Sequence, residues 1–378
     1  MTQRERILAV YEGRRPDVVP FMLDLSHWFY HRTGRPWDLT QSYERPESEL
    51  IAYHRAHRVG FYVPNLATQY GVAYGEGVLS SVRKESREGR PEIVWRLETR
   101  SGSIERRRVW EPGSYSWAIS SWGVRDERGL AVLAEALGSR SYEPLWDRFS
   151  AWRDEVGENG VVYALTGYSG MGHLLNYWMG VEGALLATAD WPAAVRETVE
   201  TINRNNLRLI DLLAASPAEV VCMGDNFSSD IQPPHFFESW SASYYREAVR
   251  RLHAAGKKVA VHVDGRLRGA LAMIGSTGAD CCDAVTPGHA DSAGRGDLSP
   301  AACRAEAGPE LILSGGVAPE LWLPGSPVGR FRQAVLEWLD TRGSSARLIA
   351  AAGDQVPPGA EEGRISLMRD LVEEHGRF

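Results

Sequence analysis

Residues 219–265 read EVVCMGDNFSSDIQPPHFFESWSASYYREAVRRLHAAGKKVAVHVDG, and this stretch decides the fold. Two apolar, β-branched runs, 219–226 and 257–265, flank a long segment with helical periodicity that begins near Pro233 and Pro234. Two strands joined through a helix pair in parallel, because the helical crossover brings the chain back in the same direction. The stretch therefore predicts one strand–helix–strand unit of a parallel α/β sheet.

The same unit recurs along the chain. Short runs rich in Val, Ile, Leu and Ala are separated mostly by helix-like segments such as 192–216 and 358–376. Eight parallel strands close a barrel, whereas an open doubly wound sheet, the alternative, would favour a glycine-rich turn after its first strand, and none is present. We therefore expect a TIM (β/α)8 barrel, as a single α/β domain over residues 1–378. The expected strands are 18–25, 60–67, 160–167, 219–226, 257–265, 282–287, 310–317 and 347–354.

One region breaks this rhythm. Residues 77–110 alternate between polar and apolar side chains, with turn signals at 88–91 and 101–103. This pattern predicts a three-stranded antiparallel β-meander, inserted at 77–115 after the second barrel strand. The run Arg106-Arg107-Arg108 lies within it, and we interpret it as a solvated edge in preference to a binding patch.

Composition narrows the class of protein. The chain has 42 Lys and Arg against 49 Asp and Glu, a net charge of −7, which argues against nonspecific nucleic-acid binding. The charged start is unlike a signal peptide, and the longest uncharged stretch, 161–181, is interrupted by glycines and polar residues, so no membrane span is expected. The four cysteines form no CxxC pair. We expect a cytoplasmic protein without disulfides.

Candidate catalytic residues follow from the barrel, whose strands carry active-site groups at their carboxyl ends. In the run 257–265, His262 and Asp264 are two residues apart, so they share one face of the strand at a Cα separation of roughly 7 Å. Both can reach one metal ion or one substrate. The alternative is a His–Asp hydrogen bond that closes the strand. Asp354 ends the last strand and either joins this site or caps the turn before Pro357.

Further substrate-binding candidates lie at or just beyond strand ends. An Asx turn is the alternative role for the Asp–Asn pair after the fourth strand, and core packing is the alternative for the aromatic residues after the third. These candidates are Asp24, His27, Tyr168, Tyr177, Asp225 and Asn226.

Four stretches resemble the uroporphyrinogen decarboxylase superfamily. They are RERILAVYEGRRPDVVPF (4–21), GHLLNYWMGVEGALLATADWPAAVRE (172–197), residues 224–265 of the opening stretch, and AAGDQVPPGAEEGRISLMRDLVEEHG (351–376). The resemblance covers most of the chain, and residues 77–115 are its least familiar part. It implies a TIM barrel, in agreement with the strand count.

The superfamily contains two chemistries. Its decarboxylases act without a cofactor and use an arginine-rich loop near the N-terminus, together with an aspartate after the second strand. Arg32 and Arg35 match that loop, but no aspartate stands near Asn65. The resemblance therefore implies, as the alternative function, a cofactor-free decarboxylase or lyase in which these arginines bind substrate carboxylates and Asp24 or Asp264 stabilises or transfers a proton.

The other branch contains corrinoid-linked methyltransferases, which hold zinc through a His-x-Cys pair and a cysteine after the last strand. His262, Asp264 and Asp354 occupy those positions here, with both cysteines replaced by aspartates. The resemblance implies a metal-assisted methyltransferase that moves a methyl group from a small O-, N- or S-methylated substrate to a corrinoid protein, or in the reverse direction. Carboxylate oxygens are harder ligands than thiolates, so the site could accept iron or manganese as well as zinc. We expect zinc first, with iron or manganese as alternatives. The corrinoid would arrive on a partner protein. The resemblance also makes a homodimer possible. A barrel that carries a ligand without turnover is a third, non-enzymatic alternative for the function.

Overall fold

The computed structural model describes residues 1–34, 38–40, 45–64, 69–288 and 296–378. Its centre is a six-stranded parallel sheet with the order β12-β11-β10-β9-β8-β7. Sequence order and spatial order coincide, as expected for successive β-α units. The strands are β7 (Ala164–Leu165), β8 (Val220–Phe227), β9 (Lys258–Val263), β10 (Cys281–Val285), β11 (Ile312–Val317) and β12 (Leu348–Ala352).

Two extended segments, around Phe21 and Phe61, complete the barrel between β12 and β7. Phe21 forms a parallel bridge with Ala350 of β12, and Phe61 forms one with Gly160, just before β7. The two segments are themselves joined, because the Gly60 amide donates to the Phe21 carbonyl at 2.9 Å. The TIM-barrel prediction is confirmed. The first three expected strands are shorter and less regular than predicted, and the end of the second lies outside the described residues.

Glycine is required where the first segments meet. A Cβ on Gly160 would stand 2.0 Å from the carbonyl oxygen of Phe61, and one on Gly60 would stand 2.8 Å from that of Phe21. Any larger residue would push the neighbouring backbones apart and break their bridges.

Alternating side chains fill the barrel interior. The hydroxyls of Tyr11 and Tyr163 lie 2.9 Å apart, so α1 (Gln3–Tyr11) closes the amino end of the cylinder. One apolar cluster contains residues from all eight parallel segments and from α1: Ile7, Val10, Tyr11, Met22, Tyr62, Val161, Tyr163, Val220, Cys222, Ala260, Cys281, Ile312 and Ile349. The barrel interior toward the amino ends of the strands is therefore a packed core and not a channel.

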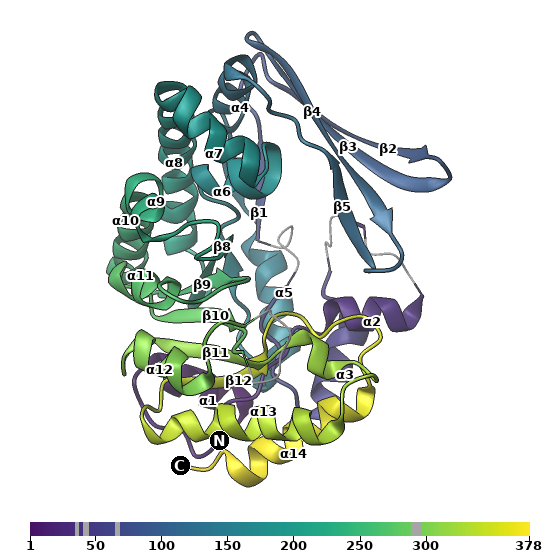
Figure 1. Cartoon of the computed structure of the whole chain (residues 1–378), viewed down its shortest axis with the longest axis vertical. Helices are drawn as coiled ribbons and strands as arrows, with labels where there is room; N and C mark the ends of the chain where they lie inside the picture. The colour runs from purple at the N-terminus through teal and green to yellow at the C-terminus, as the bar shows by residue number, and fades with distance from the viewer. Residues whose placement is uncertain (35–37, 41–44, 65–68, 289–295) are drawn as a thin grey trace.

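Helices surround the barrel (Figure 1). Pro192 begins the long helix after the third strand, as its sequence predicts, while the helical segment of the opening stretch is divided in two at Ser241. None of the helices in the described part of the chain is both long and apolar enough to cross a bilayer. The helices are α2 (Ser26–Thr33), α3 (Ser48–His57), α4 (Glu127–Gly138), α5 (Trp146–Val156), α6 (Gly170–His173), α7 (Val181–Asp190), α8 (Pro192–Ala214), α9 (Pro234–Trp240), α10 (Ala242–Ala254), α11 (Ala270–Ser276), α12 (Pro300–Ala307), α13 (Val328–Asp340) and α14 (Glu362–His375).

The inserted meander projects from one side of the barrel and has four strands, not the three predicted (Figure 1). They are β2 (Leu79–Arg87), β3 (Arg90–Thr99), β4 (Gly102–Glu111) and β5 (Ser116–Ser121). The fourth strand escaped prediction because it is short and follows a turn rich in Gly and Ser. A separate two-stranded ribbon, β1 (Tyr70–Ala73) with β6 (Ser141–Pro144), was not predicted.

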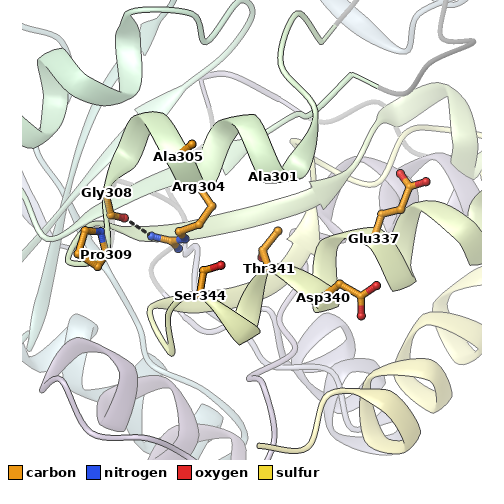
Figure 2. Close-up of a pocket in the computed structure, with 9 residues that line it drawn as sticks. All are labelled: Ala301, Arg304, Ala305, Gly308, Pro309, Glu337, Asp340, Thr341 and Ser344. Carbon is orange, nitrogen blue, oxygen red and sulfur yellow. Dashed lines mark hydrogen bonds between the residues drawn. The ribbon is translucent and has the colours of Figure 1, made fainter.

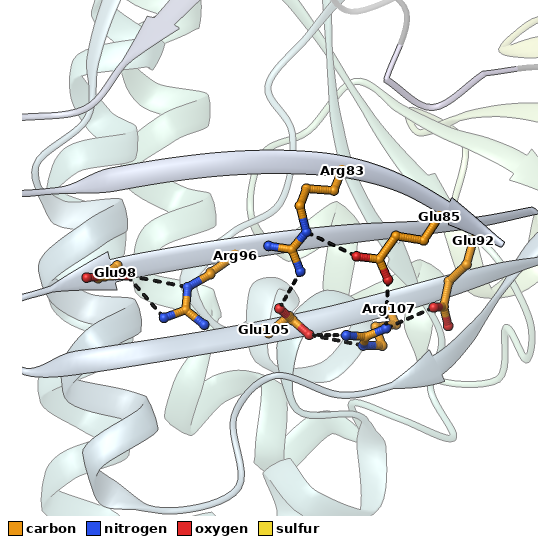
Figure 3. Close-up of polar contacts among 7 residues, drawn as sticks. All are labelled: Arg83, Glu85, Glu92, Arg96, Glu98, Glu105 and Arg107. Atoms are coloured by element: carbon orange, nitrogen blue, oxygen red, sulfur yellow. Dashed lines mark hydrogen bonds and ion pairs between the residues drawn. The ribbon is translucent and has the colours of Figure 1, made fainter. Parts of the chain in front are cut away.

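The two faces of the meander differ in chemistry. On the outer face, Arg107 forms ion pairs with Glu85, Glu92 and Glu105 (Figure 3). Arg83 forms ion pairs with two of the same residues, Glu85 and Glu105. On the inner face, Leu97 and Ile104 pack with α4, α8 and the segment after α6. The solvated-edge interpretation of the arginine run is therefore wrong for Arg106, which is inward and only 1% exposed. A strand alternates its faces, so adjacent arginines meet opposite environments.

A candidate active site at the carboxyl end of the barrel

Inward-facing polar residues form the layer above the apolar barrel core. Cys281 belongs to that core, so Asp283, two residues on, points inward one layer higher; Asp283 pairs in register with His262 of β9. The Ser314 hydroxyl of β11 donates to Asp283 at 2.7 Å. Asp24 follows Met22 in the same way and accepts hydrogen bonds from the Ser26 amide and hydroxyl. The barrel therefore brings an imidazole and two carboxyls from distant parts of the sequence to one end.

The electrostatics of these groups show that they act on each other. Burial raises the pKa of Asp354 to about 6; His262 opposes that shift, and the Asp264 and Asp24 carboxylates add to it. Burial, with a smaller contribution from Asp24, raises the pKa of Glu47 to about 7. Such mutual influence requires proximity, since the interaction of charges falls with distance. His262, Asp264 and Asp24 therefore lie near the Asp354 carboxyl. Their roles in catalysis and in metal or substrate binding stay predictions.

Asp283 and Glu47 are the site residues that sequence reasoning missed. Burial raises the pKa of Asp283, while His262 and the Ser314 hydrogen bond lower it. The available signal was strand parity: an aspartate inside the run Cys281–Val285, two residues after an inward cysteine, must face the barrel axis. Glu47 carries no comparable signal, because it lies in a loop directly before α3 and only the fold buries it.

The predicted metal ligands lie near each other, but their side chains are not arranged to coordinate an ion. His262 is half-buried, whereas Asp264 is exposed and lies just beyond the end of β9. Over the described ranges of the chain, no three His, Cys, Asp or Glu side chains stand close enough together to hold an ion. An ion here would require the Asp264 side chain to turn inward. Within the same ranges, no Lys or Arg forms an ion pair with Asp24, Asp264, Asp283 or Asp354.

Predicted substrate-binding residues on the third and fourth strands lie in a second group, beside β8. Asp225 is buried and accepts hydrogen bonds from the Ser169 amide at 2.6 Å and the Tyr245 hydroxyl at 2.8 Å. Burial raises its pKa in spite of these bonds. Asn226 adopts a left-handed conformation with φ 47°. Asp225 therefore has a supporting structural role whether or not it also contacts substrate.

Tyr168 and Tyr177 contact one another through their rings, with centroids 5.3 Å apart, and His173 packs against both. Burial raises the pKa of Tyr168 to about 12, and Asp225 adds to the shift while Arg108 opposes it. The group therefore joins residues of the third strand's loop to the inner face of the meander.

The remaining candidates fall near the first strand. His27 is the second residue of α2, where burial lowers its pKa and Asp24 opposes that effect. Arg32 is about half exposed and donates to Glu362 at 2.7 Å, so an intramolecular carboxylate already occupies it. Arg35 lies outside the described residues.

A cavity of about 440 Å³ marks the opposite end of the barrel (Figure 2). Its Arg304 donates to the carbonyls of Gly308, Leu311 and Arg347, and the last two residues immediately precede β11 and β12. Amino ends of barrel strands serve stability, so this cavity is not the active site.

Comparison with known proteins agrees with this architecture. The family model for uroporphyrinogen decarboxylase (URO-D) matches residues 157–375, more than half of the chain. The chain therefore belongs to the uroporphyrinogen decarboxylase family. No curated protein matches it.

One solved structure shares the fold of the whole chain at low sequence identity. A methyltransferase from Methanosarcina mazei is 15% identical, with a TM-score of 0.63 over 99% of both chains. A D-psicose 3-epimerase from Clostridium cellulolyticum H10 is 10% identical, with a TM-score of 0.36 over 61% of this chain and 84% of that one.

Proposed function

We propose that the protein is a methyltransferase that moves a methyl group between a small O-, N- or S-methylated substrate and a corrinoid carried by a partner protein. The observation that carries this proposal is the acidic group at the barrel mouth, where burial, and after it the Asp264 and Asp24 carboxylates, raise the pKa of Asp354 while His262 opposes the shift. Accumulated negative charge of this kind is relieved by a cation. The full-length match to a methyltransferase fold supports the choice of chemistry.

In this proposal His262, Asp264 and Asp354 hold a divalent metal ion, with zinc the first expectation and iron or manganese as alternatives. One imidazole and two carboxylates are a donor set that all three ions accept. A bound ion would supply Lewis-acid polarisation of the substrate heteroatom that loses the methyl group. Asp283, beside His262 on the next strand, would orient the imidazole as a carboxylate partner.

The chain's own residues perform the other tasks. Methyl transfer leaves an electron pair on the substrate heteroatom, which must be stabilised or protonated. Burial raises the pKa of the Asp283 carboxyl, which is not one of the proposed metal ligands, so this group can carry that proton. The packed apolar layer beneath, which includes Met22 and Ile349, keeps water from the barrel side of the site.

Metal content tests the ligand assignment. Purified protein is analysed by mass spectrometry for zinc, iron and manganese, beside His262→Ala and a matched control, His235→Ala, whose side chain is exposed on α9. Near-stoichiometric metal in the wild type and His235→Ala, with loss in His262→Ala, is the expected result. Equal, near-zero metal in all three would remove the ion from the mechanism.

Activity tests the reaction itself. Reduced cobalamin, or a corrinoid protein, is incubated with methoxylated, N-methylated or S-methylated compounds, and the cobalt spectrum is followed. Methyl transfer that depends on His262 supports the proposal. The decarboxylase alternative predicts instead carbon dioxide release from a carboxylated compound without metal; the pairing of Arg32 with Glu362 speaks against it.

A further inference from the structure

The inner face of the meander presents two cations without a counter-ion. Arg106 and Arg108 are two residues apart on β4, so their side chains share the face toward the barrel, with Cα atoms roughly 7 Å apart. Across the described residues, neither arginine forms an ion pair with a carboxylate, in contrast to Arg107 between them. Two like charges on one protected face repel each other.

Arg106 is buried among aromatic rings. Its guanidinium carbon lies 3.4 Å from the ring centroid of Tyr177, 4.1 Å from that of Trp95 and 5.2 Å from that of Trp178. The rings stabilise a cation through their faces, but they accept few hydrogen bonds. The Nε and Nη1 atoms of Arg106 are buried without a partner. Burial lowers the pKa of Arg106 to about 10, Tyr177 opposes the shift, and Arg108 adds to it.

Two more unpartnered polar atoms lie in the same group. The buried Nε of Arg108 has no partner, and its guanidinium lies 5.5 Å from the Tyr177 ring centroid. The Nδ1 of His173 is also buried without a partner, and the His173 ring contacts Tyr168 and Tyr177. Buried donors without acceptors are costly, so their accumulation at one place indicates a ligand that satisfies them.

Access to the group is through its half-buried members. Arg108, Tyr168 and Tyr177 are partly exposed, whereas Arg106 and His173 lie behind them. Tyr177 belongs to a π-helical turn, Leu174–Trp178, a rare element that often marks functional sites. Of the three rings around Arg106, the Tyr177 ring is the nearest and belongs to a partly exposed residue, so a shift of this side chain would open a path toward the Arg106 donors.

We propose that Arg106 and Arg108 form an oxyanion-binding subsite that takes the carboxylate or phosphate group of a small molecule, with Tyr177 moving aside as the anion enters. Two guanidinium groups provide the paired donors that such anions require. The two arginines support an anion-binding subsite by themselves. Only the identity of the whole ligand rests on the proposed function, which would place the methyl-bearing end of that ligand beside His262, Asp264 and Asp354. Asp225 belongs electrostatically to the same cluster, through Tyr168, and it lies near the carboxyl end of β8, the strand that pairs with the His262 strand β9.

Anion titration of the full-length protein tests this subsite without turnover. Sodium benzoate or inorganic phosphate is added at constant ionic strength, and binding is measured by calorimetry. Arg108→Gln is the test variant, because its side chain is half-buried and the loss should not impair folding. Arg107→Gln is the matched control: it removes the same charge one residue away, on the outer face (Figure 3).

We expect saturable binding that weakens at least tenfold in Arg108→Gln and is retained in Arg107→Gln, as the loss of a charge-assisted hydrogen bond implies. Arg106→Lys, which keeps the charge but loses the planar fork, should also weaken binding. Preference for benzoate assigns a carboxylate ligand, and preference for phosphate assigns a phosphate ester.

No saturable binding of either anion to the wild type, or equal weakening in both glutamine variants, would overturn the subsite. Because neither metal nor corrinoid is needed for this measurement, intact anion binding together with absent methyl transfer would overturn only the proposed function.

Discussion

Substitution of Glu47 by glutamine tests the electrostatic description of the site. The Glu47 carboxyl has a pKa of about 7 in the fold against an ordinary 4.5, because it is buried near Asp24. The folded protein therefore holds this proton more tightly than the unfolded chain does. About 2.5 pKa units at about 1.4 kcal/mol each give about 3 kcal/mol at full ionisation.

The sign of the effect follows from which state ionises first. Below pH 4.5 both states keep the proton, and Glu47 costs nothing relative to a neutral side chain. Between about pH 4.5 and pH 7 the unfolded chain ionises while the folded protein does not, so the free energy of unfolding falls as pH rises. Glutamine does not titrate. Glu47→Gln should therefore equal the wild type near pH 4 and exceed it by about 3 kcal/mol at pH 8.

Urea unfolding followed by circular dichroism at pH 4 and pH 8 measures this difference, with EDTA present so that no metal contributes. Glu49→Gln is the control, because it removes the same charge two residues away, from an exposed position in the first turn of α3. Its unfolding free energy should keep a constant offset from the wild type. If Glu47→Gln also keeps a constant offset between the two pH values, the carboxyl is not held in the buried, acidic environment described above.

Three further substitutions probe the supporting structure. Gly172→Ala would place a Cβ 2.2 Å from Oδ1 of Asp225, so we expect a loss of about 2–3 kcal/mol in thermal unfolding; an unchanged midpoint would contradict this packing. Asp225→Ala leaves two buried donors without an acceptor and should cost about 2–4 kcal/mol, measured by urea unfolding, whereas a cost near zero would mean that water replaces the carboxylate. Arg304→Met removes hydrogen bonds to three carbonyls at the amino end of the barrel and should lower stability by at least about 2 kcal/mol. Its catalytic rate should not change below the unfolding temperature, and a selective loss of activity would refute the placement of the site.

The parallel core was predictable because its signal is local. Each barrel strand from the fourth to the eighth lies within a few residues of its expected run. Continuous apolar, β-branched segments are typical of parallel strands that are buried on both faces. The first three strands were located, but their short bridged form was not foreseen. Their pairing depends on close backbone approaches at Gly60 and Gly160, which no periodicity reveals.

The site was predictable in part. His262 and Asp354 were proposed because they stand at strand ends, and the structure places them near each other and near Asp24 and Asp264, while their catalytic role stays a prediction. Asp283 was missed, although alternation from Cys281 could have found it. The burial of Arg106 runs against the sequence pattern, because three consecutive arginines usually mark a solvated edge.

The order of strands and helices, the polar strand ends and the alternation that aims His262 inward were already determined by the sequence, because they depend on neighbours one to four residues away. The tertiary structure decided which of those groups meet and how much water each one keeps. Glu47 and Asp354 stand 307 residues apart in the chain, Asp24 contributes to the raised pKa of each, and these two shifts exist only when the barrel closes. Proximity and burial are properties of the folded surface, and it is these that turn ordinary carboxyl groups into a candidate active site.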